Sequence, residues 1–340
     1  MNPKSSDAFI EKSLPRKQTK EGIETLLGKP KFAYDVEAIN SAINSPAWDL
    51  LDRGGKRWRP RLFSLIAGAF GKRDPCGLEA LVEIVHSGTL IVDDVEDSSE
   101  SRRGKPALHT IYGTDVAINL GNTLYYLPLK RVLAARIPGK MKLEILETYS
   151  IEMIRISHGQ GLDIWWHRHG KIPTEKQYLQ MCAYKTGTLA RMAAEFAGIV
   201  AGLDRRKRKV LGEFTESLGV AFQIQDDLLN LVGDFGKYGK EIGGDITEGK
   251  KTLAVIFAVG KLGKEEASEL EKIIAEHTKE PGKIERAVRL IRKSKAIEYC
   301  REKARELVKV SWAKAENVLP PSEEREELGR LARFLIERDF

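Results

Sequence analysis

The sequence carries two short acidic clusters, each inside a stretch whose apolar residues follow a helical spacing. They are Asp93-Asp94-Val95-Glu96-Asp97 and Asp226-Asp227-Leu228-Leu229-Asn230. Charged side chains are seldom buried unless they are paired or bind a metal. Asp93 and Asp97 share one face of a helix because they stand at i and i+4, and so do Asp226 and Asn230. Two such faces turned toward each other would suit Mg²⁺, with coordination positions left for water and a substrate phosphate.

Length and apolar spacing predict one large all-α domain. The chain has 340 residues, helical spacing recurs along most of it, and alternating strand patterns are scarce. We expect residues 1–31 to form a flexible polar arm. Residues 32–340 are expected to form a single domain, a bundle of about ten or more helices around a central cavity.

Composition excludes several classes of protein. No apolar run approaches the roughly 20 residues that span a bilayer, and residues 1–31 lack the apolar stretch of a secretory signal, so we expect a cytoplasmic protein without a transmembrane anchor. The three cysteines are far apart in sequence, which favours buried thiols over disulfides or a zinc site. The net charge of +7 would suit a polyanionic partner. Nucleic acid is disfavoured, because the densest basic run, residues 205–209, has no interleaved aromatic residues for base stacking.

Local signals place the helices. A capping box, Thr174 with Gln177, predicts a helix that carries Lys185 and Thr186 inward, and Pro320-Pro321 precedes the last helix. In the segment 165–169, two histidines at i and i+2 make a poor zinc set, so we interpret it as a loop anchored by a buried aromatic residue. The other helices are expected at residues 34–45, 59–70, 75–95, 107–112, 115–135, 140–164, 206–232, 252–262, 264–277, 284–294 and 296–318.

Six motifs follow one another along the chain in a recognisable order and spacing. They are Gly54-Gly55-Lys56-Arg57-Trp58-Arg59-Pro60, then His86, then Asp93 to Asp97 followed by Arg102-Arg103-Gly104, then Lys185-Thr186-Gly187, then Phe222-Gln223-Ile224-Gln225-Asp226-Asp227, and finally Asp245 to Lys251. From about Gly54 to Lys251 the chain closely resembles the trans-isoprenyl diphosphate synthases. The last motif is similar to the branch of that family that makes geranylgeranyl diphosphate.

The resemblance implies a reaction and a metal. Enzymes of this family ionise an allylic diphosphate, let the alkene of isopentenyl diphosphate attack the carbocation, and lose a proton, which the departing diphosphate would accept. By resemblance, Asp93, Asp97 and Asp226 carry Mg²⁺, with three ions when substrate is bound. Asp94 and Asp227 would support these ligands from behind or through water.

The resemblance also implies two anion sites and a site for the carbocation. Arg102, Lys185 and Lys250 would complete the allylic diphosphate pocket, with Lys240 at its mouth on a Gly-rich loop, residues 233–244, that closes over the site. Isopentenyl diphosphate would bind Lys56, Arg59, His86 and Arg103, and Arg338 is a further candidate there. Gln223 and Thr186 would face the carbocation with partial negative charge.

Product length depends on what closes the tunnel beyond Asp93. Gly88 and Thr89, about one turn before Asp93, are small, so the tunnel is not blocked there. Tyr125 and Tyr126, on the following helix, are expected to form the floor. We therefore expect mainly the C20 product, geranylgeranyl diphosphate, with C15 and C25 products as well.

Two other functions remain open. A class I terpene cyclase shares the fold and the first cluster, and Asp226, Asn230 and Asp234 resemble its second metal motif, but it would not need a second diphosphate site. A non-catalytic subunit of a prenyl synthase is the other, although both clusters are intact. Asn230 departs from the family pattern, in which many members carry Asp. The family is typically homodimeric, so we expect a homodimer or a higher homo-oligomer.

Overall fold

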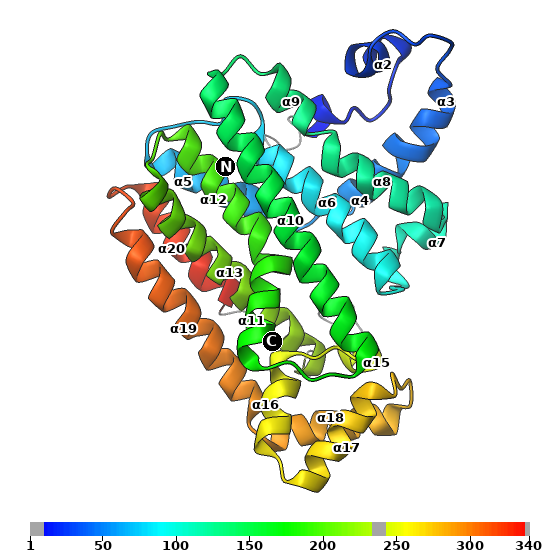
Figure 1. Ribbon diagram of the computed structural model, residues 1–340, viewed down its shortest axis with the longest axis vertical. Coiled ribbons are helices and arrows are strands. Elements are labelled where there is room, and N and C mark those ends of the chain that lie inside the picture. Colours follow the sequence, from blue (N-terminus) through cyan, green and yellow to red (C-terminus); the bar gives the residue numbers. More distant parts are fainter. Residues whose placement is uncertain (1–9, 233–242, 337–340) are drawn as a thin grey trace.

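The computed structural model describes residues 10–232 and 243–336, and nearly all of its regular secondary structure is helical (Figure 1). The predicted all-α class is therefore confirmed. The elements up to the long central helix are α2 (Lys20–Leu27), α3 (Val36–Ile39), the π-helical turn η1 (Asn40–Asn44), α4 (Ser45–Asp52), α5 (Trp58–Ala69), α6 (Leu78–Glu96), the short strands β1 (Ser101–Arg102) and β2 (Lys105–Pro106), α7 (Leu108–Tyr112), α8 (Thr114–Tyr126), α9 (Leu129–Ala134) and α10 (Gly139–His169).

The remaining elements begin after the turn that ends α10. They are α11 (Glu175–Cys182), the π-helical turn η2 (Ala183–Gly187), α12 (Thr188–Val200), α13 (Arg205–Val232), α15 (Gly244–Thr247), α16 (Leu253–Lys261), α17 (Lys264–Ala275), α18 (Pro281–Lys293), α19 (Ala296–Glu316) and α20 (Glu323–Ile336). Helices α16 to α18 form one end of the molecule, and α2 and α3 lie at the other (Figure 1).

Helix α13 is the centre of the packing. It contacts α12 along one side and α19 along another, and α12 also packs on α10 and α5. Small residues make this close approach possible, since the α12 side chains of Ala190, Ala193 and Ala197 are completely buried. The second acidic cluster therefore belongs to a helix that is fixed by neighbours on several sides.

Helix α6, which carries the first acidic cluster, packs against α8 through two glycines. A Cβ on Gly121 would lie 2.4 Å from Val92 Cγ2, and one on Gly88 would lie 3.1 Å from the carbonyl oxygen of Gly121. Any larger side chain would push the helices apart. Gly88 is therefore needed for helix contact, whatever its effect on the tunnel.

Part of the segment expected to form a flexible arm, residues 10–16, is docked on the helical body. Ile10 and Leu14 are buried in a cluster with Trp48, whose Nε1 donates to the Leu14 carbonyl at 3.0 Å. Arg16 pairs with Asp52 at 2.8 Å. A few apolar residues in a polar stretch thus suffice to dock it on α4, which the overall composition of the segment did not indicate.

Two helix boundaries differ from those expected. The helix predicted over residues 115–135 is divided into α8 and α9 at Leu127-Pro128, because proline has no N–H to continue the helical ladder. The segment 165–169 is the last turn of α10 and not a loop. Its buried aromatic residue is Trp166, and the helix ends at Gly170 in the left-handed conformation. The capping box at Thr174 and Gln177 is confirmed.

The three cysteines are buried thiols, as the sequence predicts. Cys76, Cys182 and Cys300 are all buried and unpaired. Within the described ranges, none of the helices combines the length and the apolar character that crossing a bilayer requires.

Candidate active site

The first acidic cluster lies where α6 ends. Asp93 and Asp94 occupy its last turn, and Asp97 follows as the C-cap, with its N–H donating to the Asp93 carbonyl at 2.8 Å. The i, i+4 spacing places Asp93 and Asp97 on one face. Asp94 is buried, and Arg102 Nε donates to its carboxylate at 2.8 Å. Asp94 is thus tied to the chain that follows α6.

Asp93 lies among positive and amide groups from other elements. Lys185 Nζ is 3.2 Å from its Oδ1, and Gln160 Nε2 of α10 donates to the same oxygen at 3.0 Å. Burial by itself raises the pKa of this carboxyl, but the charges of Lys185, Lys250 and Arg102 outweigh burial and lower the pKa to about 2. Asp93 is therefore a carboxylate held by cations.

The Lys185-Thr186-Gly187 motif forms the end of η2, a single π-helical turn between α11 and α12. Such turns insert an extra residue into a helix and are frequent at functional sites. A Cβ on Gly159 of α10 would lie 2.3 Å from the Lys185 backbone nitrogen, and one on Gly219 of α13 would lie 2.7 Å from Gly187 Cα. The turn is pressed between α10 and α13. This position brings Lys185 Nζ to 2.6 Å from Asp163 Oδ2.

Lys250 links the first cluster to the segment after the second. Its Nζ lies 3.1 Å from Asp97 Oδ2 and 4.0 Å from Asp245 Oδ1, and it also pairs with Glu248. Asp245 is held by Asn230, whose side-chain oxygen accepts from the Asp245 N–H at 2.9 Å. Asn230 thus anchors the segment that carries Asp245 and Lys250.

Gln223 and Asp227 are one turn apart on α13, and Gln223 Nε2 donates to Asp227 Oδ1 at 2.7 Å. Thr186 Oγ1 donates to Gln223 Oε1 at 2.7 Å, and the Tyr178 hydroxyl of α11 donates to Asp227 Oδ2 at 2.7 Å. Burial first, and then the charge of Asp245, raise the pKa of Asp227 to about 7 despite these donors. Thr186 and Gln223, which the sequence assigned to one role, are in direct contact.

The second acidic cluster shares charged neighbours with the rest of the site. Asp226 is half-buried, and its charge raises the pKa of Arg59 against the larger lowering effect of burial. Lys250 acts on both clusters, since its charge lowers the pKa of Asp93 and that of Asp227. The two acidic clusters therefore do not lie on remote surfaces.

The four residues that the sequence assigned to a second anion site are also brought together. They are Lys56, Arg59, His86 and Arg103. Arg59 Nη1 lies 3.1 Å from His86 Nε2, and a Cβ on Gly55, beside Lys56, would lie 2.9 Å from Arg103 Nη2. Lys56 Nζ lies over the Phe222 ring, 5.2 Å from its centroid. We call these four residues the basic group.

Burial controls the charge state inside the basic group. Arg59 is only 7 % exposed, and burial lowers its pKa to about 10, with Glu83 and Asp226 opposing the shift. Burial and then the charge of Arg59 keep the pKa of His86 well below 6.5. Because Arg59 can only donate, the neutral His86 ring accepts at Nε2 and carries its proton on Nδ1. Within the described residues Arg59 Nε has no hydrogen-bond partner, as expected of a group that binds an anion.

Arg102 and Arg103 are presented by a tight hairpin. Strands β1 and β2 pair antiparallel, and the residues between them, Arg103 (φ 53°) and Gly104 (φ 73°), are both left-handed, as in a type I′ turn. Arg53 Nη1 donates to the carbonyls of Arg102 at 3.1 Å and Pro106 at 2.8 Å. Arg53 is itself paired with Asp49 at 3.0 Å. The hairpin is therefore fixed from behind by a buried guanidinium.

The two tyrosines expected to form the floor differ in burial. Tyr125 is partly buried against the core, and a Cβ on Gly88 would lie 3.1 Å from its Cε1. Tyr126 is 72 % exposed, since adjacent residues of a helix face directions about 100° apart. The floor therefore stays a prediction, and burial favours Tyr125 for it. Thr89 is partly buried, and its hydroxyl donates to the His86 carbonyl at 2.8 Å.

Several polar residues at the site escaped the sequence analysis. Gln160 and Asp163, at i and i+3 on α10, share a helix face, which is a signal that the sequence did contain. Glu83 and Tyr178 gave no comparable signal, because single polar residues in a helical pattern are usually structural. Asp245 belongs to the sixth motif, but the sequence analysis gave it no role of its own. Lys240, the loop residues 233–242, Asp234 of the cyclase-like motif and Arg338 lie outside the described residues.

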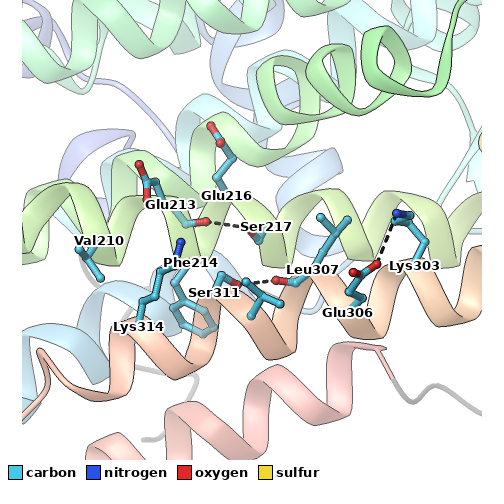
Figure 2. A pocket seen from close by; sticks show the side chains of 11 residues that line it. Val210, Glu213, Phe214, Glu216, Ser217, Lys303, Glu306, Leu307, Ser311 and Lys314 are labelled. Carbon is cyan, nitrogen blue, oxygen red and sulfur yellow. Dashed lines mark hydrogen bonds and ion pairs between the residues drawn. The ribbon is translucent and has the colours of Figure 1, made fainter.

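A separate groove of about 460 Å³ lies between α13 and α19 (Figure 2). Some of its polar groups are already paired: Ser217 and Ser311 donate to backbone carbonyls one turn earlier, each at 2.8 Å, and Lys303 pairs with Glu306 at 3.3 Å. The described residues that line it include none of the predicted site residues. We therefore interpret it as a packing groove.

The acidic residues fit hard divalent cations. Over residues 10–232 and 243–336, no three acidic, histidine or cysteine side chains converge as a complete ion site. Asp93 and Asp97 instead bind the ammonium groups of Lys185 and Lys250. Partly buried carboxylate oxygens of this kind suit Mg²⁺ when phosphate oxygens supply the other ligands, which is the usual mode of magnesium binding beside phosphate.

Comparison with known proteins identifies the family. Residues 40–291 match the family model for polyprenyl synthetase. The geranylgeranyl pyrophosphate synthase of Geoglobus acetivorans is 35 % identical over 291 residues, which are 85 % of this chain and 88 % of that protein. The geranylfarnesyl diphosphate synthase of Natronomonas pharaonis is 32 % identical over 309 residues, covering 86 % and 88 %.

A solved structure shows the same architecture. The polyprenyl synthase from Caulobacter crescentus, complexed with calcium and isoprenyl diphosphate, matches with a TM-score of 0.82 at 28 % identity, covering 98 % of this chain and 95 % of that one. The family match covers most of the chain, and the two acidic clusters and the basic group lie within it. The chain therefore belongs to the polyprenyl synthetase family and is a prenyltransferase.

Proposed function

We propose that the protein is a Mg²⁺-dependent synthase that condenses isopentenyl diphosphate with allylic diphosphates. Its main product would be geranylgeranyl diphosphate (C20), accompanied by C15 and C25 products. The observation that carries the proposal is that the described residues form two clusters of different chemistry. One pairs carboxylates with lysines and suits a metal-bound diphosphate. The other is the basic group, which suits a diphosphate without metal.

The allylic diphosphate belongs to the site of the acidic clusters. Asp93, Asp97 and Asp226 would hold the magnesium, as three ions when substrate is bound, and bound Mg²⁺ neutralises the charge that develops on the leaving diphosphate. Lys185 and Lys250, already beside these carboxylates, would then contact diphosphate oxygens. Arg102 contributes from the hairpin.

Isopentenyl diphosphate belongs to the basic group. Arg59 offers a planar set of donors, fixed by stacking on Trp58 at 4.5 Å and by its contact with His86. Lys56 and Arg103 add charge at the more exposed side. A class I cyclase would not need this second anion site, so the basic group favours chain elongation.

The reaction then follows from the two sites. The allylic C–O bond breaks, the electron pair leaves with the diphosphate, and the alkene of isopentenyl diphosphate attacks the carbocation to form a C–C bond. The proton lost in the last step goes to the departing diphosphate. Thr186 and Gln223 would face the cation with preorganised dipoles, which are worth more in a site without bulk water than in solution. Tyr125, packed against Gly88, would limit chain length.

The assembly and location complete the proposal. Helices α8 and α10 expose large apolar side chains, among them Ile118 and Tyr126 on α8 and Ile151, Ile154 and Trp165 on α10. Exposed apolar surface of this extent favours a homodimer or a higher homo-oligomer. The three unpaired thiols fit a reducing, cytoplasmic environment.

Product analysis tests the proposal directly. The purified protein would be incubated with Mg²⁺, labelled isopentenyl diphosphate and a C5, C10 or C15 allylic diphosphate, and the dephosphorylated products would be separated by reverse-phase chromatography. We expect mainly C20 alcohol, with label incorporated. A cyclase would instead release hydrocarbon from the allylic substrate alone, and a non-catalytic subunit would form no product in either assay.

A further inference from the structure

A continuous chain of hydrogen bonds runs from the buried interior to the proposed carbocation site. The Tyr178 hydroxyl donates to Asp227 Oδ2, Gln223 Nε2 donates to Asp227 Oδ1, and Thr186 Oγ1 donates to Gln223 Oε1, each at 2.7 Å. These residues come from α11, α13 and η2, so the chain crosses three elements. Tyr178, at its inner end, is only 2 % exposed.

The direction of these hydrogen bonds is set at the buried end of the chain, where Tyr178 and Asp227 meet. Asp227 receives a donor at each of its oxygens, the Tyr178 hydroxyl at Oδ2 and the Gln223 NH₂ group at Oδ1. The Gln223 amide therefore turns its NH₂ group toward Asp227 and its carbonyl oxygen toward Thr186. The Thr186 hydroxyl must then donate to that oxygen, which directs its hydrogen into the protein.

We propose that Tyr178 is a positioning residue that, through Asp227 and Gln223, keeps the oxygen lone pairs of Thr186 directed toward the carbocation. This inference rests on the proposed function. A hydroxyl whose hydrogen is already donated presents only negative partial charge on its free side. The reverse orientation would present a positive hydrogen to a cation. A dipole fixed before the cation forms needs no reorganisation during the reaction.

Tyr178 suits this role because its hydroxyl is a constant donor. Burial first, and then the charge of Asp227, raise its pKa well above 10, so it keeps its proton. Its hydrogen bond pins one oxygen of Asp227 and leaves the other aimed at Gln223. Without the Tyr178 hydrogen bond, the side chain of Asp227 is free to rotate. The Gln223 amide then loses the contact that keeps its NH₂ group on one side and its oxygen on the other.

The test is Tyr178→Phe, which removes one hydroxyl from the inner end. We expect kcat to fall about tenfold, which is less than the loss of rate that follows removal of a preorganised donor in direct contact with the reacting group. KM for each substrate should change less than about twofold. Binding of a tertiary ammonium analogue of the allylic diphosphate, measured by calorimetry with Mg²⁺, should weaken about tenfold. Binding of an uncharged allylic thiodiphosphate should not change, because the effect is specific to positive charge.

Two controls separate positioning from stability. Tyr299→Phe also removes a tyrosine hydroxyl, which donates a partly buried hydrogen bond to Glu175 at the start of α11 at 2.5 Å. This variant should leave the activity and the affinities for both analogues unchanged. In a Thr186→Val background, Tyr178→Phe should cost nothing further, because the end of the chain is already removed. Thr186→Ser, which keeps the hydroxyl, should retain the preference for the ammonium analogue.

The outcomes are distinct. Equal weakening of both analogues, independent losses in the double variant, or an unchanged Tyr178→Phe enzyme would each overturn the inference. The ammonium preference is measured without turnover. If the wild type forms no prenyl product, the proposed function fails; if Tyr178→Phe still weakens binding of the ammonium analogue alone, the positioning role of Tyr178 is supported independently.

Discussion

Lys185 Nζ lies 3.2 Å from Asp93 Oδ1, so the Lys-Thr-Gly motif of η2 contacts the first acidic cluster of α6 directly. Asp163 holds the same ammonium group at 2.6 Å. The lysine is thus positioned by carboxylates before any diphosphate arrives. The arrangement explains how the acids of the first cluster are tolerated at the end of α6, since Asp93, Asp94 and Asp97 are each paired with a cation.

Asp93→Ala should lower the rate of product formation at least about a hundredfold at saturating Mg²⁺, because the carboxylate orients a catalytic metal and the diphosphate with it. The matched control is Asp115→Ala, an exposed acid in the first turn of α8, which should retain full activity. Steady-state product assays check both variants. A loss below about tenfold in Asp93→Ala would remove this residue from the metal site.

Arg59→Lys should raise KM for isopentenyl diphosphate about tenfold and leave KM for the allylic substrate unchanged. A lysine loses the planar set of donors and the stacking on Trp58, and both contribute only to the basic group. Arg61→Lys, on the same helix but exposed and paired with Glu327, is the control. The assignment of the two anion sites fails if Arg59→Lys changes the two KM values equally.

Tyr125→Ala should shift the product distribution from C20 toward longer chains, because it opens the space beside Gly88. Tyr126→Ala should leave the distribution unchanged, since that side chain is exposed. Chromatography of the dephosphorylated products measures both. An unchanged distribution in Tyr125→Ala would place the floor elsewhere.

Stability should decline on mild acidification because of His86. Its pKa in the folded state is well below 6.5, so the unfolded chain takes up a proton that the folded protein resists. The neutral His86 therefore contributes its full share to the free energy of unfolding above pH 6.5. This share is lost as pH falls below 6.5, at up to about 1.4 kcal/mol per pH unit.

The measurement is urea unfolding of wild type and His86→Gln between pH 8 and 5. We expect the free energy of unfolding to fall more steeply below pH 6.5 in the wild type, because the glutamine side chain does not titrate. Parallel curves for the two proteins would show that His86 binds its proton equally well in both states.

Local sequence signals determined much of the architecture. The capping box at Thr174 and the helical spacing of apolar residues depend on contacts within a turn or two, so the all-α class and most helix positions could be predicted. The same is true of the shared face of Asp93 and Asp97. The order of the six motifs was enough to indicate the family.

Tertiary packing decided what the local pattern could not. Sequence spacing does not reveal which neighbour a face meets, and here the close approach of backbones at Gly159 and Gly219 places Lys185 between α10 and α13. Packing also decides that Tyr125 is partly buried whereas Tyr126 is exposed. It brings Asn230 to the backbone of Asp245, which Asn230 holds by a hydrogen bond. Helical periodicity is a property of consecutive residues, whereas a site is made by segments that meet only after the chain has folded.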